Sequence, residues 1–409
     1  FYEMQLPRPW GPDDERKLFH DALEQVVLAD RLGFDYAWEV EHHFLDEYSH
    51  SSSPEVFLAA AAARTSRIRL GHGIRQVIPN YNHPARTAEC LATLDLLSNG
   101  RVEFGIGEGA TRLELGGFKI PAKEKRAMSL EAAEQIANMM ALEPYPGFEG
   151  QYFSMPCRNV LPKPVQKPHP PMWIACTNRD TIKLAAKLGL GALAFSFVDP
   201  EEARNWADIY YGIIKSEECV PLGRTVNANI AMVSSFSLHQ DRAEAIRRGH
   251  EGFEFFGYAL NALVAHDTVP GRTNLWGEYL AQRGNRTDEI IAASREGAQS
   301  SGIGTPEDMR THLRALQGAG VDQVIFLQQA GRNRHEHICQ SLQLFADTVM
   351  VEFREAAAAR EKAKQEALQP YIDAALKRKQ WMQPLGKDDV PVVRASVKQA
   401  QVGGTLGAG

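Results

Sequence analysis

The chain of 409 residues has few cysteines, and no two of them form the Cys-x-x-Cys pair that is typical of zinc and redox sites. The five cysteines are widely scattered, and their odd number argues against a framework of disulfides. No apolar run of about 18 residues occurs, so a transmembrane helix is not expected, and no signal peptide is recognisable. We therefore expect a cytoplasmic protein with reduced thiols and no membrane partner.

The sequence also lacks an excess of basic residues, because 45 Lys and Arg stand against 51 Asp and Glu, for a net charge of −6. A nucleic-acid-binding domain needs a basic surface, so no nucleic acid is expected as a partner. With 44% hydrophobic and 23% charged residues, the composition is that of an ordinary globular protein. The chain opens at Phe1 without a methionine, and we expect the first residues of an opening strand to precede it.

Short apolar segments alternate with helical patterns along residues 1–353. The eight segments expected as strands are residues 1–4, 34–38, 68–74, 101–107, 172–175, 192–195, 227–233 and 321–327. Repeated strand–helix units predict an α/β fold with a parallel sheet, and eight of them predict a (β/α)₈ TIM barrel. An open doubly wound sheet is the alternative, but it usually has fewer strands and a Gly-x-Gly-x-x-Gly motif after the first strand. Neither feature is present.

Some segments do not fit the repeat. Residues 107–109 predict a glycine-rich loop before a helix at 124–142, and residues 145–170 predict an extended, proline-rich segment. Residues 234–303 follow the seventh strand as an insertion with many aromatic side chains, expected either to form a mobile lid over a substrate pocket or to pack as an ordinary insertion. A last helix is expected at residues 335–353, which closes a barrel domain of residues 1–353.

The remainder, residues 354–409, is expected to form a helical arm and a loose tail. Residues 354–379 are rich in Ala, Glu, Lys and Arg, which predicts a solvated helix, whereas residues 380–409 show no pattern. We expect this segment to pack on a neighbouring subunit.

The most informative stretch is Glu41-His42-His43, at the end of the expected second strand. Barrels of this class place their chemistry at the C-terminal ends of the strands. Adjacent histidines on extended backbone point to opposite faces, so they do not share a metal without distant ligands. His42 is therefore a candidate acid–base group, and the alternative is a histidine that is merely satisfied in the mouth of the barrel.

Several stretches, taken together, resemble the bacterial luciferase-like, flavin-dependent monooxygenase family. They are residues 41–44, 82–84, 93–101, 104–107, 162–166, 304–307 and 318–322. Each stretch is weak evidence alone. Because they occur in order and at spacings compatible with a barrel, their combination is specific for the family, although not for a substrate. The resemblance covers roughly residues 1–353.

The resemblance implies that reduced FMN, supplied by a separate flavin reductase, reacts with O₂. A flavin hydroperoxide would then oxygenate a small organic substrate, with the protein positioning the cofactor and excluding water. The resemblance leaves open a deazaflavin-dependent dehydrogenase on the same fold and a non-catalytic flavin-binding protein. A metal-dependent hydrolase would need ligands at several strand ends, and besides the two histidines only His72 offers one, so no metal is expected. A homo-oligomer is expected.

Individual residues acquire expected roles from the resemblance. His42 matches the family's catalytic histidine beside the flavin, Glu41 could orient a histidine, and His43 is expected to be structural. Gly73 and Ile74 match the strand end that backs the flavin ring, where relatives often have a non-proline cis peptide.

The flavin phosphate is expected near a second group of residues. Arg126 matches an arginine on the flavin side, and its forked donors suit phosphate. The loop after the fifth strand matches a site where backbone N–H groups and a hydroxyl bind phosphate at a helix N-terminus, and it comprises Ala175, Cys176 and Thr177.

The chain departs from the family pattern after the fourth strand. Gly107 occupies the position of the luciferase cysteine, so light emission is not implied, and we expect this glycine to lie beside the flavin. Glu108 follows where relatives often have an arginine, and its carboxylate would repel phosphate. Arg75, Arg112 or Arg179 could compensate, or Glu108 could face the substrate.

Overall fold

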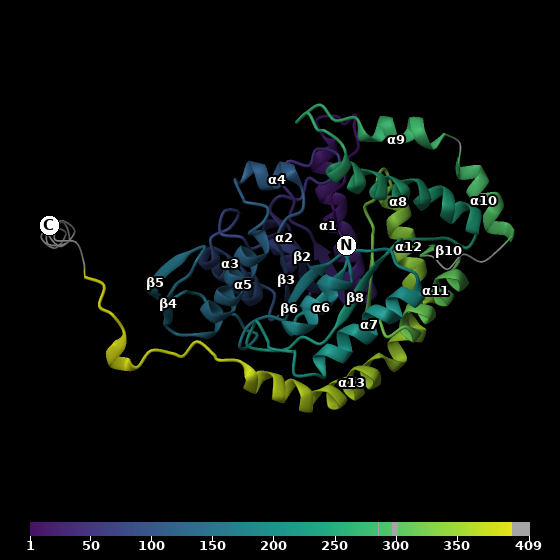
Figure 1. Ribbon diagram of the computed structural model, residues 1–409. Helices are drawn as coiled ribbons and strands as arrows, with labels where there is room; N and C mark the ends of the chain where they lie inside the picture. The colour runs from purple at the N-terminus through teal and green to yellow at the C-terminus, as the bar shows by residue number, and fades with distance from the viewer. Residues whose placement is uncertain (285, 297–301, 395–409) are drawn as a thin grey trace, which may run out of the picture.

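The computed structural model describes residues 1–284, 286–296 and 302–394. At its centre lies one parallel sheet of seven strands (Figure 1). Their order in the sheet is their order in the chain: β1 (Tyr36–Glu39), β2 (Arg69–Gln76), β3 (Val102–Gly107), β6 (Met172–Cys176), β7 (Gly191–Ala194), β8 (Ile230–Ser234) and β11 (Gln323–Phe326). These are the second to eighth strands of the prediction, so the α/β class and the parallel sheet are confirmed.

The expected first strand is only a short segment between the two edges of the sheet. Tyr2 forms a single parallel bridge with Glu39, and its N–H donates to the carbonyl of Trp38 at 2.9 Å. On the other side, the N–H of Gln328, just after β11, donates to the carbonyl of Phe1 at 3.4 Å. The structure therefore has a parallel sheet of seven strands, and a bridging segment stands in place of the predicted first strand of an eight-stranded barrel.

The sheet curls so that side chains from distant strands meet inside it. Trp38 on β1 and Trp173 on β6 are separated by two strands, yet their ring centroids lie 5.4 Å apart in an edge-to-face contact. Two glycines make the space, because a Cβ at Gly71 would lie 2.2 Å from Trp38 and a Cβ at Gly191 would lie 2.3 Å from Trp173. Both indoles are almost fully buried, and aromatic pairs of this kind dominate the energetics of a core.

Helices connect the strands and surround the sheet (Figure 1). They are α1 (Asp14–Leu32), α2 (Pro54–Arg64), α3 (Pro84–Leu97), α5 (Lys125–Ala141), α6 (Arg179–Lys187), α7 (Pro200–Ile214), α11 (Pro306–Gly318) and α12 (His335–Thr348). Local signals set their starts. For example, Thr305 and Asp308 form a reciprocal capping box at the start of α11, followed by a proline in the first turn.

Two elements between β3 and β6 differ from the prediction. The short helix α4 (Arg112–Gly117) follows β3, beyond the expected glycine-rich loop. The segment expected to be extended contains an antiparallel hairpin, β4 (Tyr145–Glu149) and β5 (Ser154–Arg158). Its prolines concealed it, but both strands are edges of a two-stranded sheet, where proline is tolerated because no inner ladder is interrupted.

The insertion after β8 contains β9 (Ser237–Leu238), α8 (Arg242–Ala265), α9 (Leu275–Arg283) and α10 (Arg286–Glu296), and β9 pairs with β10 (Ile303–Gly304). Glu47, buried in the loop after β1, caps the start of α9: its carboxylate accepts from the N–H groups of Leu275 at 2.6 Å and Trp276 at 3.1 Å. The same carboxylate accepts from the N–H of Arg8 at 2.9 Å. Residues 285 and 297–301 of the expected insertion lie outside the described residues.

The expected closing helix and the expected arm divide at a different place. Helix α12 ends at Thr348, and α13 (Met350–Arg378) begins directly afterwards, along the lower edge in Figure 1. Most of α13 is exposed, as predicted for a solvated helix, but Leu368 and Ala375 are buried against the body of the protein. A 3₁₀ turn, Lys387–Asp389, follows. Of the predicted tail, residues 395–409 lie outside the described residues.

Candidate active site

His42 lies at the C-terminal edge of the sheet between two carboxylates. Its Nδ1 is 3.0 Å from Oε1 of Glu114, and its Nε2 is 3.4 Å from Oε1 of Glu3. The edge of the ring meets Tyr48, with centroids 5.6 Å apart. The side chain of His42 is 22% exposed, whereas both carboxylates are buried. Each ring nitrogen of His42 therefore lies beside a carboxylate, and part of the ring remains accessible to a ligand.

Burial alone would lower the pKa of His42, but the charges of Glu3 and Glu114 outweigh it and raise the pKa to about 9. The two carboxyl groups respond differently. Burial raises the pKa of Glu3 to about 8, against the attraction of His42. Burial also acts to raise the pKa of Glu114, but His42 and hydrogen bonds from its neighbours hold that pKa below its usual range. At neutral pH the site thus contains an imidazolium beside an ionised Glu114.

The side chain of His43 belongs to a different cluster from that of His42. Its Nε2 lies 3.1 Å from Oε1 of Glu41, and its ring stacks on Tyr81. Glu41 also accepts from the N–H of Gln76 at 2.9 Å and from Nδ2 of Asn82 at 2.8 Å. Glu41 is therefore paired with His43, and it ties the loop after β1 to the end of β2.

The strand ends that were expected to back a flavin ring lie beside this cluster. The Gly73–Ile74 peptide is cis, as the resemblance implied. The side chain of Ile74 leans across to Gly107 on β3, where a Cβ would lie 2.0 Å from Cδ1 of Ile74. Gly107 therefore cannot be replaced by the cysteine of luciferase without displacing Ile74.

Two polar atoms at the same edge suit a cofactor. Among the described residues, neither Oε1 of Gln76 nor the hydroxyl of Tyr81 has a hydrogen-bond partner, although both atoms are buried. A Cβ at Gly109 would lie 2.8 Å from the Tyr81 hydroxyl and 3.6 Å from Gln76 Oε1, so the two atoms flank one glycine. Buried polar groups normally find partners, and the polar edge of a flavin ring carries both donors and acceptors. The residues present therefore fit a flavin.

Arg126, the expected phosphate ligand, is paired with the residue that departs from the family pattern. Its Nε and Nη2 each lie 3.1 Å from an oxygen of Glu108, and this fork raises the pKa of Arg126. Lys125 also lies 3.5 Å from Glu108. Of the three arginines named as substitutes, Arg75 is buried against Glu55 at 2.7 Å and Arg179 pairs with Glu202. The charge of Glu108 is therefore neutralised within the chain.

The loop after β6 is largely satisfied by its own side chains. The N–H groups of Thr177 and Asn178 both donate to the hydroxyl of Thr181, and Asn178 caps α6 in a capping box. Burial raises the pKa of Cys176 to about 12, which keeps the thiol protonated. Thr177 is exposed, and its hydroxyl accepts from Nδ2 of Asn178 at 3.4 Å, so its own proton remains available to a ligand.

Tyr48 links His42 to an aromatic side chain of the insertion. Phe256 on α8 contacts Tyr48, with ring centroids 5.6 Å apart, and Tyr48 contacts His42. Phe197, which is exposed after β7, meets Phe256 and Phe253 edge to face. A series of aromatic contacts thus extends from His42 to the insertion.

Two site residues escaped the sequence analysis. Glu114 lies in the short helix α4, and its signal was the Thr111-x-x-Glu114 pattern of a capping box: Thr111 accepts from the N–H of Glu114 at 3.1 Å. Glu3 lies on the bridging segment, whose single β-bridge gives little periodicity to read.

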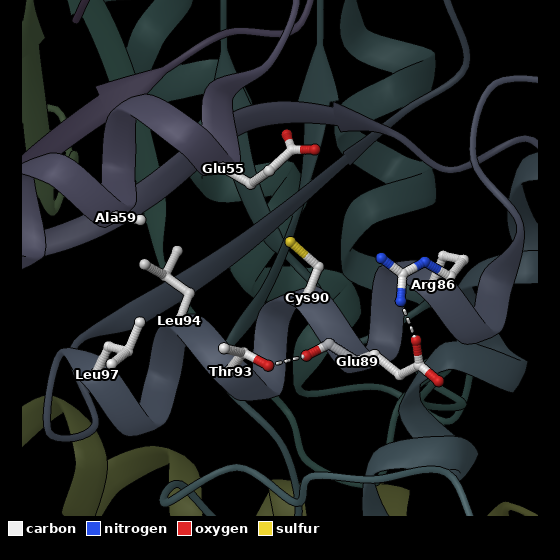
Figure 2. Close-up of a pocket in the computed structure, with 8 residues that line it drawn as sticks. All are labelled: Glu55, Ala59, Arg86, Glu89, Cys90, Thr93, Leu94 and Leu97. Atoms are coloured by element: carbon white, nitrogen blue, oxygen red, sulfur yellow. Dashed lines mark hydrogen bonds and ion pairs between the residues drawn. The ribbon is translucent and has the colours of Figure 1, made fainter.

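A hollow of about 240 Å³ lies elsewhere, between α2 and α3 (Figure 2). It is lined by Glu55, Ala59, Arg86, Glu89, Cys90, Thr93, Leu94 and Leu97. These residues belong to the helices, so the hollow is on the outer side of the sheet and apart from His42. In the part of the chain that the structure describes, no group of three or more His, Cys, Asp or Glu is placed to hold a metal. Within those residues, no helix is long and apolar enough to cross a membrane.

Comparison with known proteins gives a consistent picture. A family model described as luciferase-like monooxygenase matches residues 5–323. Protein y4wF of Sinorhizobium fredii, which has no described function, is 34% identical over 62% of this chain and 73% of its own length. Limonene 1,2-monooxygenase of Rhodococcus erythropolis is 29% identical over 76% of this chain and 75% of its own. The crystal structure of monooxygenase RslO1 from Streptomyces bottropensis superposes with a TM-score of 0.68 and 27% identity, covering 84% of this chain and 96% of that one.

Two further relatives bear on the cofactor. The oxygenase component of the flavin-dependent trigonelline monooxygenase of Acinetobacter baylyi is 28% identical over 46% of this chain and 51% of its own length. An F420-dependent glucose-6-phosphate dehydrogenase of Microbacterium testaceum is 28% identical over 48% of this chain and 60% of its own. The chain thus spans only about half the length of some curated relatives that it matches.

The hydrogen bonds of Glu41 predict a large structural effect of its removal. Glu41→Ala leaves the buried N–H of Gln76 without its acceptor, at a cost of about 1–3 kcal/mol, and it removes the partner of His43, whereas Asn82 keeps the carbonyl of Gln76. We expect the urea midpoint of unfolding to fall clearly, while Glu15→Ala, which removes an exposed partner of His50, changes it little. Equal midpoints in the two variants would contradict a structural role for Glu41.

Proposed function

The chain belongs to the luciferase-like monooxygenase family, and on that premise we propose that it uses reduced FMN and O₂ to oxygenate a small organic substrate. The observation that carries the proposal is the position of His42, held by Glu114 and Glu3 at the strand ends beside the Gly73–Ile74 peptide. Reduced FMN, when bound, supplies the electrons that activate O₂. The protein's own part is to orient the cofactor, exclude water and hold a proton at His42.

The residues proposed to hold FMN divide into two groups. Gly73, Ile74 and Gly107 would back the ring, with Gln76 and Tyr81 at its polar edge. Toward the phosphate, the proposal keeps Arg126 together with the loop Ala175, Cys176 and Thr177. Arg126 would then exchange part of its pairing with Glu108 for phosphate, and the hydroxyl of Thr177 would donate to the same group.

The proposal includes partners. The printed name of the relative from Acinetobacter baylyi, an oxygenase component, supports a separate flavin reductase as the source of reduced FMN. The aromatic contacts of Tyr48, Phe256 and Phe197 support a substrate with apolar surface, and the position of Phe256 on α8 supports a lid role for the insertion.

A deazaflavin-dependent dehydrogenase is the second candidate, because relatives that depend on F420 match the chain over a similar span. Such an enzyme would transfer a hydride and ignore O₂. Anaerobic titration separates the two, since tight binding of F420 together with no binding of FMN would overturn the proposed cofactor.

The phosphate assignment predicts that Arg126→Ala and Thr177→Ala weaken binding of reduced FMN. A charge-assisted hydrogen bond contributes about 1.5–3 kcal/mol, so the Arg126 variant should raise the Kd by roughly tenfold or more. Anaerobic fluorescence titration measures the Kd, and Arg64→Ala, which removes an exposed arginine paired with Glu24, is the matched control. Glu108→Gln should strengthen binding because it releases Arg126 from its ion pair.

If Arg126→Ala and Thr177→Ala both bind FMN as the wild type does, the phosphate lies elsewhere on the chain. Unchanged affinity in Glu108→Gln as well would show that this ion pair does not face the cofactor.

His42→Ala tests the proposed chemistry. Positioned acid–base help accelerates a step by about 10²–10⁴-fold, so this variant should keep its fold and most of its FMN affinity while losing coupled product formation and releasing hydrogen peroxide. His43→Ala should mainly lower stability, because it removes the partner of Glu41 and the stack on Tyr81. Stopped-flow spectra and product yields identical to wild type in His42→Ala would leave the histidine with a structural role only.

We also propose that the chain self-associates through the outer face of α2 and α3. Val56 on α2 and Leu97 on α3 are 67% and 63% exposed, and the hollow of Figure 2 lies between the two helices. On its rim Arg86 and Glu89 pair with each other at 2.5 Å, so no unpaired charge of these two opposes an apolar two-fold contact of the patch with its own copy.

Leu97→Glu should therefore shift the protein toward monomer, because two copies of the new carboxylate would be brought into an apolar contact. Sedimentation velocity over a concentration series measures the change. Val264→Glu, which alters a side chain of 65% exposure on α8, is the control and should leave association unchanged. A monomeric wild type at all concentrations would contradict this part of the proposal.

A further inference from the structure

The two carboxylates beside His42 differ in their own surroundings. Glu114 is fully buried and receives three hydrogen-bond contacts: from Nδ1 of His42 at 3.0 Å, from the N–H of His43 at 3.1 Å and from the hydroxyl of Thr111 at 2.8 Å. These contacts favour the ionised carboxylate. In contrast, Oε1 of Glu3 has no hydrogen-bond partner among the described residues, and its closest basic group is Nε2 of His42 at 3.4 Å.

We propose that Glu114 is a positioning residue that keeps His42 doubly protonated with Nδ1–H fixed, so that His42 donates a proton from Nε2 in the reaction instead of accepting one. Glu3, whose Oε1 lies 3.4 Å from Nε2, places a second carboxyl group beside the nitrogen that donates. Each turnover then moves one proton from Nε2 to the reacting oxygen and one from solvent back to Nε2. The catalytic part of this inference rests on the proposed function, whereas the pairing of Glu114 with His42 does not.

The surroundings of His42 shift its pKa in two opposite directions. The carboxylates of Glu3, Glu114 and Glu41 raise the pKa of His42, and burial among these groups and Tyr48 lowers it, with a net value of about 9. A proton donor must be protonated, so the role of His42 as an acid is present below this value and is lost as the pH rises through it. Removing the charge of Glu114 should move that loss to lower pH by about one to three units.

The pairing can be tested on the protein without flavin. Histidine-selective ¹³C or ¹⁵N NMR would follow the ring of His42 with pH, its signal being assigned by its absence in His42→Gln. In the wild type the ring should titrate near pH 9, and in Glu114→Gln the midpoint should fall by about one to three units. Glu114→Asp keeps the charge and should restore most of the difference.

A matched control separates this effect from a general loss of charge. Glu131 is another carboxylate that accepts backbone N–H groups, from Gln151 and Tyr152, and it does not face His42. Glu131→Gln should leave the titration of His42 unchanged. If Glu114→Gln does not fold, the wild type still decides, because a His42 midpoint at or below about 6.5, the usual histidine value, overturns the proposal.

The catalytic part has its own measurement. With saturating reduced FMN, the high-pH limb of product formation should move to lower pH in Glu114→Gln, in step with the NMR midpoint, and return in Glu114→Asp. A merely structural role would lower activity equally at every pH and would overturn the assignment of His42 as a donor. If FMN is not the cofactor, the NMR result still tests the pairing, so the two failures are distinguishable.

Discussion

A carboxylate that is removed from water needs positive charge or hydrogen-bond donors, and this constraint organises the C-terminal edge of the sheet. Glu114 meets it with His42, Glu41 with His43, and Glu47 with the first N–H groups of α9. In the interior, Glu103 meets it with the indole N–H of Trp173 at 2.6 Å. Each of these buried carboxylates therefore holds together two segments that are separated along the chain. Glu3 and Glu39 meet it less completely, because one oxygen of each has no hydrogen-bond partner among the described residues.

Much of the scaffold could be predicted, because strands that are buried on both faces appear as short apolar runs with helical patterns between them. The seven strands of the sheet were located in this way, and the strand-end position of His42 followed from them. Elements held by tertiary contacts were less visible. The helix that carries Glu114 has six residues, which is too short for a periodic pattern, and the segment that carries Glu3 is held by one bridge and the edges of the sheet.

The pairing of Arg126 with Glu108 could not be predicted from the sequence. Arg126 and Glu108 were judged separately, one as favourable and the other as unfavourable for an anion. They lie on different elements, and only the folded chain shows that each is the other's partner. Arg126 and Lys125 consequently share one carboxylate before any ligand arrives. Attraction of a phosphate to this place then depends on how far the guanidinium of Arg126 separates from Glu108. The number of basic residues alone does not decide it.

The hydrogen bonds of Glu47 have a mechanical consequence. This carboxylate lies in the loop after β1 that also contains His42. It accepts hydrogen bonds from two backbone N–H groups in the first turn of α9. The insertion and the loop that carries His42 are thus joined through one buried carboxylate. A displacement of α9 is therefore coupled to a displacement of the loop that follows β1.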